Sequence, residues 1–294
     1  MTRPTPSTSE HLASVTWGIS PIRHVDEFFQ HLNSLVERAV SQGASIVMLP
    51  ELFETELLKT LPDGAESQVA HALAPFAERI DDALKDLAQK HSATIIGGSH
   101  VRNVADGYAN VCTIAQPDGT LHFQPKNCRT QWEIFPWGLQ EHHGLRRLPD
   151  SRLGVLICYD SEFPEAARAL AEAGTELLCV PSYTETQHGY QRVHWSCRAR
   201  AVENEIFVAQ ASIVGEIECF GLGTGYGRSS IIAPSKDPFP PSAILAESPL
   251  NQEGIAIATL DFNALAACRT TGDARPWADR HRATWKFLES QDSP

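Results

Sequence analysis

The chain has 294 residues, of which 42% are hydrophobic and 20% are charged, and this composition is typical of a globular protein. Its formal net charge of −12 argues against nucleic acid or an anionic membrane as the main partner, because both require a basic surface. No apolar run approaches the ~18 residues that a membrane-spanning helix needs.

Strand and helix signals alternate through the first half of the chain. Apolar side chains recur at helical spacing over residues 25–42 and 67–91, which predicts two amphipathic helices, the second kinked at Pro75. His31 is expected on the solvated face of the first helix. Residues 126–144 show no periodicity and are expected to be irregular. Short apolar runs predict strands over residues 11–16, 45–49, 93–97, 110–115 and 120–124.

The second half of the chain continues this alternation. Strands are expected over residues 145–148, 153–157, 176–180, 206–211, 229–233 and 255–260. Helices are expected over residues 164–173, 189–204 and 262–268. Because no linker interrupts the pattern, residues 11–288 are expected to form a single α/β domain. Disordered tails are expected over residues 1–10 and 289–294.

Three of the predicted strands end at a side chain that can take part in catalysis. Glu51 follows one apolar strand, Lys126 follows a second and Cys158 follows a third. Because open α/β sheets collect their functional groups at one rim of the strands, these side chains are expected to meet in space. Glu51 could take the proton of the thiol, Cys158 could attack a carbonyl carbon, and Lys126 could offset the charge of the intermediate.

Cys158 lies at a predicted turn between a strand and a helix. The free N–H groups at the start of a helix favour negative charge, so the thiol is expected to ionise more easily at this turn. The same N–H groups can bind an oxyanion. The alternative for a free cysteine is a buried structural thiol, which is the expectation for Cys112 and Cys179 inside apolar strands.

Five sequence fragments resemble, in the same order, those of the nitrilase superfamily of carbon–nitrogen hydrolases. They are Leu49-Pro50-Glu51, Lys126, Ile157-Cys158-Tyr159-Asp160, Arg198 to Asn204, and Gly227 to Pro234. The resemblance covers about residues 11–288 and implies the superfamily's four-layer α-β-β-α sandwich. It also implies a catalytic triad of Glu51, Lys126 and Cys158, no cofactor, and a homodimer or larger homo-oligomer.

The residues around this triad resemble the amidase-like branch of the superfamily. Tyr159 and Asp160 stand where true nitrilases usually carry Trp and Glu. Amidase-like members carry a second glutamate after the lysine, thought to position the substrate, and Glu133 is expected in that role, with Glu141 as the alternative. By resemblance, the backbone N–H of Tyr159 binds the oxyanion. Substrate contacts are expected from Tyr159, Trp132 and Tyr183.

The expected reaction is hydrolysis of a small amide or N-carbamoyl compound through a thioester, with release of ammonia or an amine. A nitrilase or an amide-forming acyltransferase could use the same three residues, and a non-catalytic scaffold protein is the alternative from another class. The chain has seven cysteines, an odd number at wide spacing without a Cys-x-x-Cys pair. This pattern disfavours a metal site and favours free thiols in a reducing cytoplasm.

Overall fold

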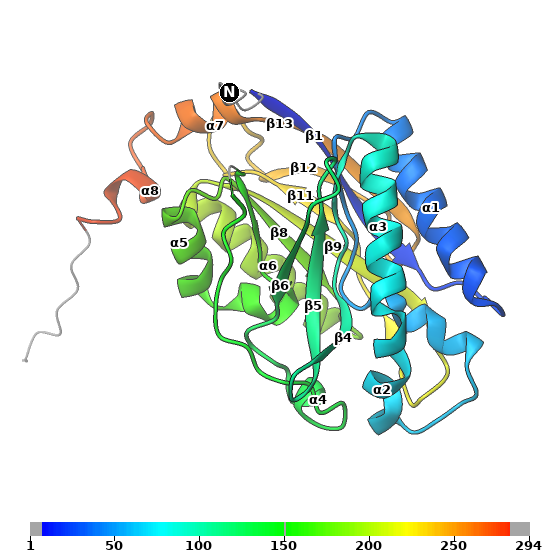
Figure 1. The fold of residues 1–294 in the computed structure, drawn as a ribbon. Helices are drawn as coiled ribbons and strands as arrows, with labels where there is room; N and C mark the ends of the chain where they lie inside the picture. Colours follow the sequence, from blue (N-terminus) through cyan, green and yellow to red (C-terminus); the bar gives the residue numbers. More distant parts are fainter. Residues whose placement is uncertain (1–7, 150, 283–294) are drawn as a thin grey trace, which may run out of the picture.

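A computed structural model describes residues 8–149 and 151–282, which form a curled β-sheet with helices on its outer faces (Figure 1). The strands are β1 Ser9–Gly18, β2 Ile46–Met48, β3 Thr94–Ile96, β4 His100–Val104, β5 Gly107–Ala115, β6 Leu121–Pro125, β7 Leu153–Val155, β8 Leu177–Ser182, β9 Phe207–Glu216, β10 Thr224–Gly225, β11 Ser230–Ile232, β12 Ile244–Glu247 and β13 Gly254–Asp261. The α-helices are α1 Val25–Ser41, α2 Val69–Leu73, α3 Ala77–His91, α4 Gln131–Ile134, α5 Pro164–Glu172, α6 Gln187–Asn204, α7 Phe262–Cys268 and α8 Pro276–Asp279. Short 3₁₀ helices are η1 Phe53–Thr60, η2 Glu66–Gln68, η3 Ala74–Phe76 and η4 Cys158–Glu162.

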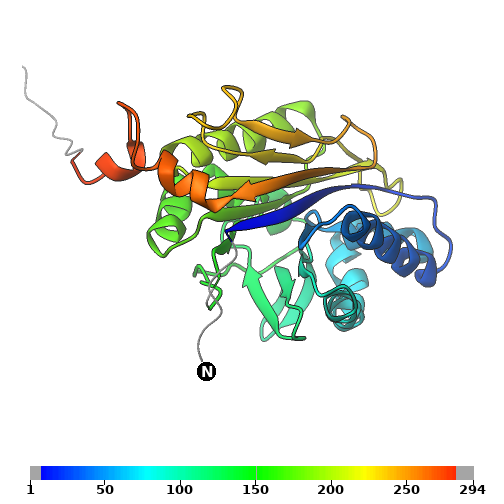
Figure 2. The same cartoon turned by 90° about the horizontal axis from the view of Figure 1, so that it is seen from above.

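Strand β1 joins the two halves of the sheet. It pairs in parallel with β2 on one side and, further along its length, with β9, and it pairs antiparallel with β13. From β2 the sheet continues through β3 to β5, which carries β4 and β6. From β9 it continues through β8 to β7 and through β11 to β12. Figure 2 shows the two halves facing each other, with α1 and α3 outside one half and α5 and α6 outside the other, which confirms the predicted four-layer α-β-β-α sandwich.

Apolar side chains fill the spaces between these layers. In β2, Ile46 and Met48 pack in the cluster between the two half-sheets, whereas Val47 packs in the cluster beneath α1 and α3. Successive side chains of a strand point to opposite faces, so a strand covered on both faces is apolar throughout. This double coverage explains why the sequence from Ile46 to Leu49 carries no polar residue, and it fixes the position of the residues that follow.

Most of the predicted elements are present, and the differences have local causes. The helix expected over residues 67–91 is interrupted by η3 at Pro75, because proline lacks the N–H that the helix requires. Residues 145–148 were expected as a strand but are irregular, and the backbone N–H of Arg146 donates to the Gln124 side chain. Residues 9 and 10, expected in a tail, pair with β13. The remaining parts of the expected tails, residues 1–7 and 289–294, lie outside the described residues.

The expectation that His31 faces solvent is wrong. Its side chain is 13% exposed, with Nδ1 3.1 Å from Glu56 Oε2 and Nε2 2.7 Å from Glu253 Oε2. Burial by itself lowers the pKa of His31, but the hydrogen bonds to Glu253 and Glu56 outweigh it and raise that pKa to about 9. These three residues, called the His31 clamp below, tie α1 to η1 and to the turn before β13.

Within residues 8–149 and 151–282, no helix is both long enough and apolar enough to cross a membrane.

Candidate active site

The ends of three strands from the two halves of the sheet bring the predicted site residues together. Glu51 lies just beyond β2, Lys126 follows β6 directly, and Cys158 begins η4 shortly after β7. The backbone beyond β2 lies unusually close to Gly98, which has φ +58°: a Cβ there would stand 1.9 Å from the carbonyl oxygen of Pro50. Because no other residue fits at Gly98, this glycine sets the path of the chain just before Glu51.

Lys126 and two carboxylates form a buried set of charges at the centre of the site. Lys126 Nζ is 2.8 Å from Glu51 Oε1 and 2.6 Å from Glu133 Oε2. The side-chain amide of Asn110 donates to both carboxylates, at 2.9 Å to Glu51 and 3.0 Å to Glu133. Each of the three charged side chains is 3% exposed or less, so the charges depend on one another for compensation. These four residues are called the lysine cluster below.

The environment of the cluster separates the pKa values of its two carboxyl groups. Burial raises the pKa of Glu51, and the neighbouring Glu133 carboxylate raises it further, although Lys126 opposes both. Burial also raises the pKa of Glu133, but Lys126 and the amide of Asn110 outweigh it, so this pKa is lowered. Lys126 itself is desolvated, yet the two carboxylates raise its pKa well above the ordinary value. Glu133 and Lys126 therefore remain charged, whereas Glu51 is the group that can accept a proton.

Cys158 is buried next to this cluster in a left-handed backbone conformation, with φ +47°. A non-glycine residue rarely adopts this conformation, and such residues gather at functional sites. Its Sγ lies 3.7 Å from the carbonyl oxygen of Tyr183. Tyr183 also donates its backbone N–H to Glu51 Oε2 at 2.8 Å. The backbone of Tyr183 thus links the thiol to the carboxylate.

The expectation that the turn makes the thiol easier to ionise is wrong for this structure. Burial raises the pKa of Cys158 well above its ordinary value, the Glu51 carboxylate raises it further, and Lys126 offsets only part of the increase. The turn is a short 3₁₀ segment, and its N–H groups do not overcome the loss of solvent and the adjacent negative charge. The thiol therefore keeps its proton until a neighbouring base removes it.

The structure brings Glu133, and not Glu141, to the lysine. Thr130 caps α4 by accepting a hydrogen bond from the backbone N–H of Glu133, and Glu133 Oε2 accepts one from the backbone N–H of Thr130. This capping box orients the Glu133 side chain toward Lys126. Glu141 is 48% exposed and pairs with Arg129. Helix α4 was not predicted, although Thr130 followed three residues later by a glutamate is a recognised helix-start pattern.

Asp160 connects the lysine segment to the cysteine segment. Its carboxylate accepts hydrogen bonds from the backbone N–H groups of Asn127 and Cys128, just after Lys126, and from that of Ile157, just before Cys158. It is 1% exposed. Asp160 therefore holds together the segment after Lys126 and the segment around Cys158, which are distant in the sequence.

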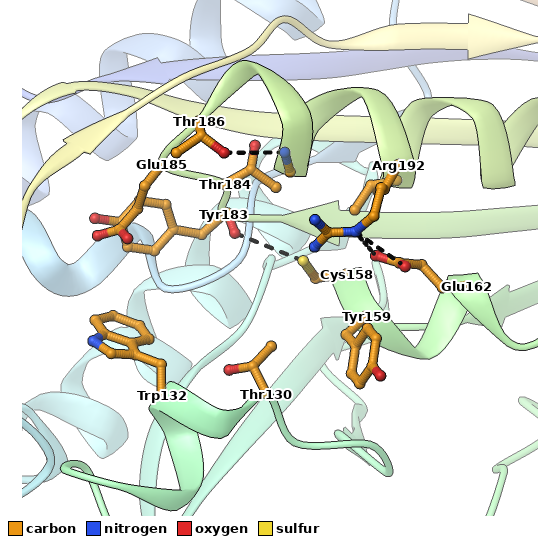
Figure 3. A pocket seen from close by; sticks show the side chains of 12 residues that line it. Thr130, Trp132, Cys158, Tyr159, Glu162, Tyr183, Thr184, Glu185, Thr186 and Arg192 are labelled. Atoms are coloured by element: carbon orange, nitrogen blue, oxygen red, sulfur yellow. Dashed lines mark hydrogen bonds and ion pairs between the residues drawn. The ribbon is translucent and has the colours of Figure 1, made fainter.

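A cavity of about 220 Å³ opens directly onto Cys158 (Figure 3). Tyr159, Trp132 and Tyr183, the three residues expected to contact substrate, all line it, and the rings of Trp132 and Tyr183 meet edge to face at 6.1 Å. Its size is below the usual range for drug-sized ligands, which favours a small substrate. The other lining residues are Thr130, Glu162, Thr184, Glu185, Thr186, Gly189, Arg192 and Val193. Among the described residues, no group of three His, Cys, Asp or Glu side chains is placed to hold a metal ion.

Sequence reasoning missed Asn110 and the charged lining residues of the cavity. Asn110 carried a usable signal, because an amide side chain in a mostly apolar strand must find a buried partner. Glu162, Glu185 and Arg192 carried none, since charged residues in and next to helices are common on protein surfaces.

Residues 12–270 match the family model described as carbon-nitrogen hydrolase. The chain belongs to this family. A probable hydrolase of Bacillus subtilis, YhcX, is 30% identical to it over 271 residues, which is 91% of this chain and 53% of YhcX. Human omega-amidase NIT2 is 29% identical, with 89% of this chain and 92% of NIT2 covered. The chloroplastic omega-amidase of Arabidopsis thaliana is also 29% identical, with 82% of this chain and 65% of the relative covered. The chain thus spans about half the length of YhcX and about two thirds of the chloroplastic enzyme.

Solved structures of carbon–nitrogen hydrolases share the fold. Saccharomyces cerevisiae Nit3, a member of branch 10 of the nitrilase superfamily, superposes with a TM-score of 0.72 at 25% identity, covering 89% of this chain and 93% of Nit3. A double mutant of the amidase from Nesterenkonia sp. AN1, in complex with acrylamide, superposes with a TM-score of 0.67 at 22% identity, covering 96% of this chain and 99% of the amidase.

Proposed function

We propose that this protein is a cysteine amidohydrolase that cleaves the carbon–nitrogen bond of a small amide or N-carbamoyl compound through a thioester. One observation carries the proposal: the Cys158 thiol borders the cavity and interacts with the Glu51 carboxylate, whose pKa is raised. A nucleophile, a base able to hold its proton and a space for substrate therefore lie together. The omega-amidase relatives support an amide as the substrate.

The first half of the reaction forms the thioester. Glu51 takes the proton of Cys158 as the sulfur attacks the amide carbon, and the carbonyl oxygen becomes an oxyanion. The ammonium group of Lys126 and the backbone N–H of Tyr159 stabilise this negative charge. Glu51 then returns the proton to the nitrogen, the carbon–nitrogen bond breaks, and ammonia or an amine leaves.

The second half of the reaction releases the acid. Glu51 takes a proton from water, and the oxygen attacks the thioester carbon to form a second oxyanion at the same place. When this intermediate collapses, the carbon–sulfur bond breaks and Glu51 returns the proton to Cys158. Glu133 and Asn110 keep Lys126 and Glu51 in position through both halves, because Glu133 pairs with Lys126 and Asn110 donates to both Glu51 and Glu133.

Ammonia release from primary amides, ω-amidated acids, N-carbamoyl compounds and nitriles tests the proposal. Wild-type protein should release ammonia from at least one amide, and Cys158→Ala should lose at least about 10³-fold in rate. Cys219→Ala, which replaces a half-buried cysteine outside the cavity, is the matched control and should keep the activity. Quenched wild-type enzyme should also show the mass of the acyl group on Cys158.

Other products would identify the alternatives. An acid formed from a nitrile alone would make the protein a nitrilase, and a new amide formed with an added amine would make it an acyltransferase. If no compound reacted and Cys158 were alkylated by iodoacetamide no faster than the other thiols, the protein would be a scaffold and the proposal would fail.

We further propose a reducing cytoplasm as the site of action and a homodimer or larger assembly as the active form. All seven cysteines are free, which fits a compartment without disulfide formation. Trp195 and Val202, on α6, are exposed apolar side chains that a second copy could cover. Light scattering at micromolar concentration should give at least twice the chain mass of 32.3 kDa, and a monomer would contradict the assembly.

A further inference from the structure

The turn η4, which begins at Cys158, is separated from α5 by a break in the backbone. Phe163 has an extended conformation, with φ −97° and ψ 110°, and α5 begins at Pro164, which has no N–H. In an unbroken helix the carbonyls of Ser161 and Glu162 would accept N–H groups from the following turn. Because of the break, these two carbonyls need donors from another part of the chain.

Arg200 on α6 supplies these donors. Its Nε donates to the Ser161 carbonyl at 2.9 Å, and its Nη2 donates to the Glu162 carbonyl at 3.0 Å. Its Nη1 lies 3.0 Å from Glu203 Oε1, which compensates the charge. Arg200 is 6% exposed and Ser161 is 0% exposed, so loss of the guanidinium would leave a buried carbonyl without a partner. The rigid fork of arginine matches two adjacent acceptors, whereas the single nitrogen of lysine, on a flexible stem, does not.

Ser161 connects Arg200 to the peptide unit between Cys158 and Tyr159. Its hydroxyl donates to the Cys158 carbonyl at 2.7 Å. This peptide bond is trans, so its C=O and N–H point in opposite directions, and a bond that holds the Cys158 carbonyl also fixes the direction of the Tyr159 N–H. The first hydrogen bond within η4 is donated by the Asp160 N–H, so the turn itself does not use the N–H of Tyr159.

The backbone of Cys158 requires such support. Its φ of +47° lies in the left-handed region, and a residue with a side chain keeps this conformation only when its surroundings hold it there. Helix α6 also holds the Glu162 side chain, through Arg192 at 3.4 Å (Figure 3). The Arg192 side chain is 61% exposed, so this outer ion pair is weak and the buried Arg200 is the stronger restraint.

We infer that Arg200 and Ser161 are positioning residues, which hold the peptide between Cys158 and Tyr159 so that its N–H points at the developing oxyanion. The inference rests on the proposed function and adds to it two residues that do not line the cavity. Since neither side chain contacts the thiol or its base, both should affect stabilisation of the oxyanion and not removal of the thiol proton.

Two reactions of Cys158 separate this role from general support of the fold. Iodomethane joins its carbon to the sulfur as iodide leaves and Glu51 takes the thiol proton, and no oxyanion forms. Butanal adds its carbonyl carbon to the sulfur, Glu51 takes the same proton, and the carbonyl oxygen becomes an oxyanion, so its affinity depends on the oxyanion donors. Mass spectrometry measures methylation of Cys158, and protection against methylation measures butanal binding.

Arg200→Lys keeps the positive charge beside Glu203 but loses the fork. Butanal should bind about ten- to a hundredfold more weakly, and kcat for the best amide should fall by a similar factor with KM within about twofold of the wild-type value. The rate of methylation by iodomethane should also stay within about twofold, because the thiol and its base are unchanged. Arg79→Lys, which replaces an exposed arginine paired with Asp26, is the matched control and should alter none of these values.

Ser161→Ala tests the second link and also serves if Arg200→Lys does not fold. It removes one hydroxyl and should weaken butanal binding about three- to tenfold without slowing methylation. Its control is Ser41→Ala, which removes a hydroxyl that donates to the carbonyl of Arg38, likewise three residues earlier.

The outcomes separate this inference from the proposed function. If both variants bound butanal as tightly as wild-type protein, or lost butanal binding and methylation equally, Arg200 and Ser161 would have no role in orienting the N–H. Wild-type protein that still released ammonia would then leave the amidohydrolase proposal standing. If wild-type protein neither bound butanal nor released ammonia, the inference would fall together with the proposed function.

Discussion

The lysine cluster and the His31 clamp both place a cation between two carboxylates, but they differ in what lies next to them. Lys126 is 2.6 and 2.8 Å from its two partners, and His31 is 2.7 and 3.1 Å from its own. The lysine cluster borders a thiol and a cavity, whereas the clamp joins α1 to η1 and to the turn before β13. Charges alone therefore do not identify a reactive site; a nucleophile and space for a substrate are also required.

Lys126→Met should have the largest effect, because it removes the cation shared by two buried carboxylates. We expect a loss of about 3–5 kcal/mol in the free energy of unfolding at neutral pH, and a loss of about 10²–10³-fold in kcat. Urea unfolding and ammonia release measure the two effects. The loss of stability should be smaller at low pH, where the carboxyl groups take up protons. Lys90→Met removes an exposed lysine paired with Glu37 and should cost less than about 1 kcal/mol.

His31→Gln should change stability without changing catalysis. The pKa of His31 is raised to about 9 in the folded protein, so its protonation stabilises the fold fully below the unfolded value near 6.5 and ceases to do so as pH rises through 9. We expect a cost of about 1–2 kcal/mol at pH 6 and much less at pH 10, measured by urea unfolding. His143→Gln, at an exposed position, should cost little at either pH. An equal cost at both pH values would contradict a charged clamp.

Glu54→Gln should have the smallest effect and should be stabilising at high pH. Glu54 lies between Glu51 of the lysine cluster and Glu56 of the clamp, and burial raises its pKa to about 8. Stability linked to this group is present below its ordinary pKa of 4.5 and is lost as pH rises through 8, because the buried carboxyl must then ionise. Glutamine stays neutral and can still accept the hydrogen bond of the Val101 N–H. The midpoint of thermal unfolding should therefore be higher in the variant at pH 9 and similar at pH 5.

The positions of Glu51, Lys126 and Cys158 were predictable because short-range sequence signals determine them. Each residue follows a strand whose apolar residues are visible in the sequence, and the curled sheet brings the ends of these strands together. The four-layer fold followed from the resemblance, and the alternation of strands and helices was consistent with it. Strand β4 was missed because polar residues interrupt its apolar ones, and β12 was missed although its first three residues are apolar, because it is short and only partly buried.

The rest depended on contacts between distant parts of the chain. His31 meets Glu56 and Glu253, which are 25 and 222 residues away, so its environment could not be deduced from the helix that carries it. The raised pKa of Cys158 likewise depends on burial and on Glu51, whereas the local turn alone suggested the opposite. Local sequence patterns thus predicted which groups react, whereas the ionisation states of these groups depend on tertiary packing.

The backbone and the side chain of Tyr183 have different roles in the site. Its N–H holds the Glu51 carboxylate and its carbonyl faces the Cys158 sulfur, whereas its ring forms part of the cavity wall. Any amino acid except proline supplies the same backbone groups. A substitution at position 183 can therefore alter which molecules fit the cavity while the reacting groups stay in place. Changes at this position, in natural or laboratory evolution, can thus alter substrate specificity without altering the reaction.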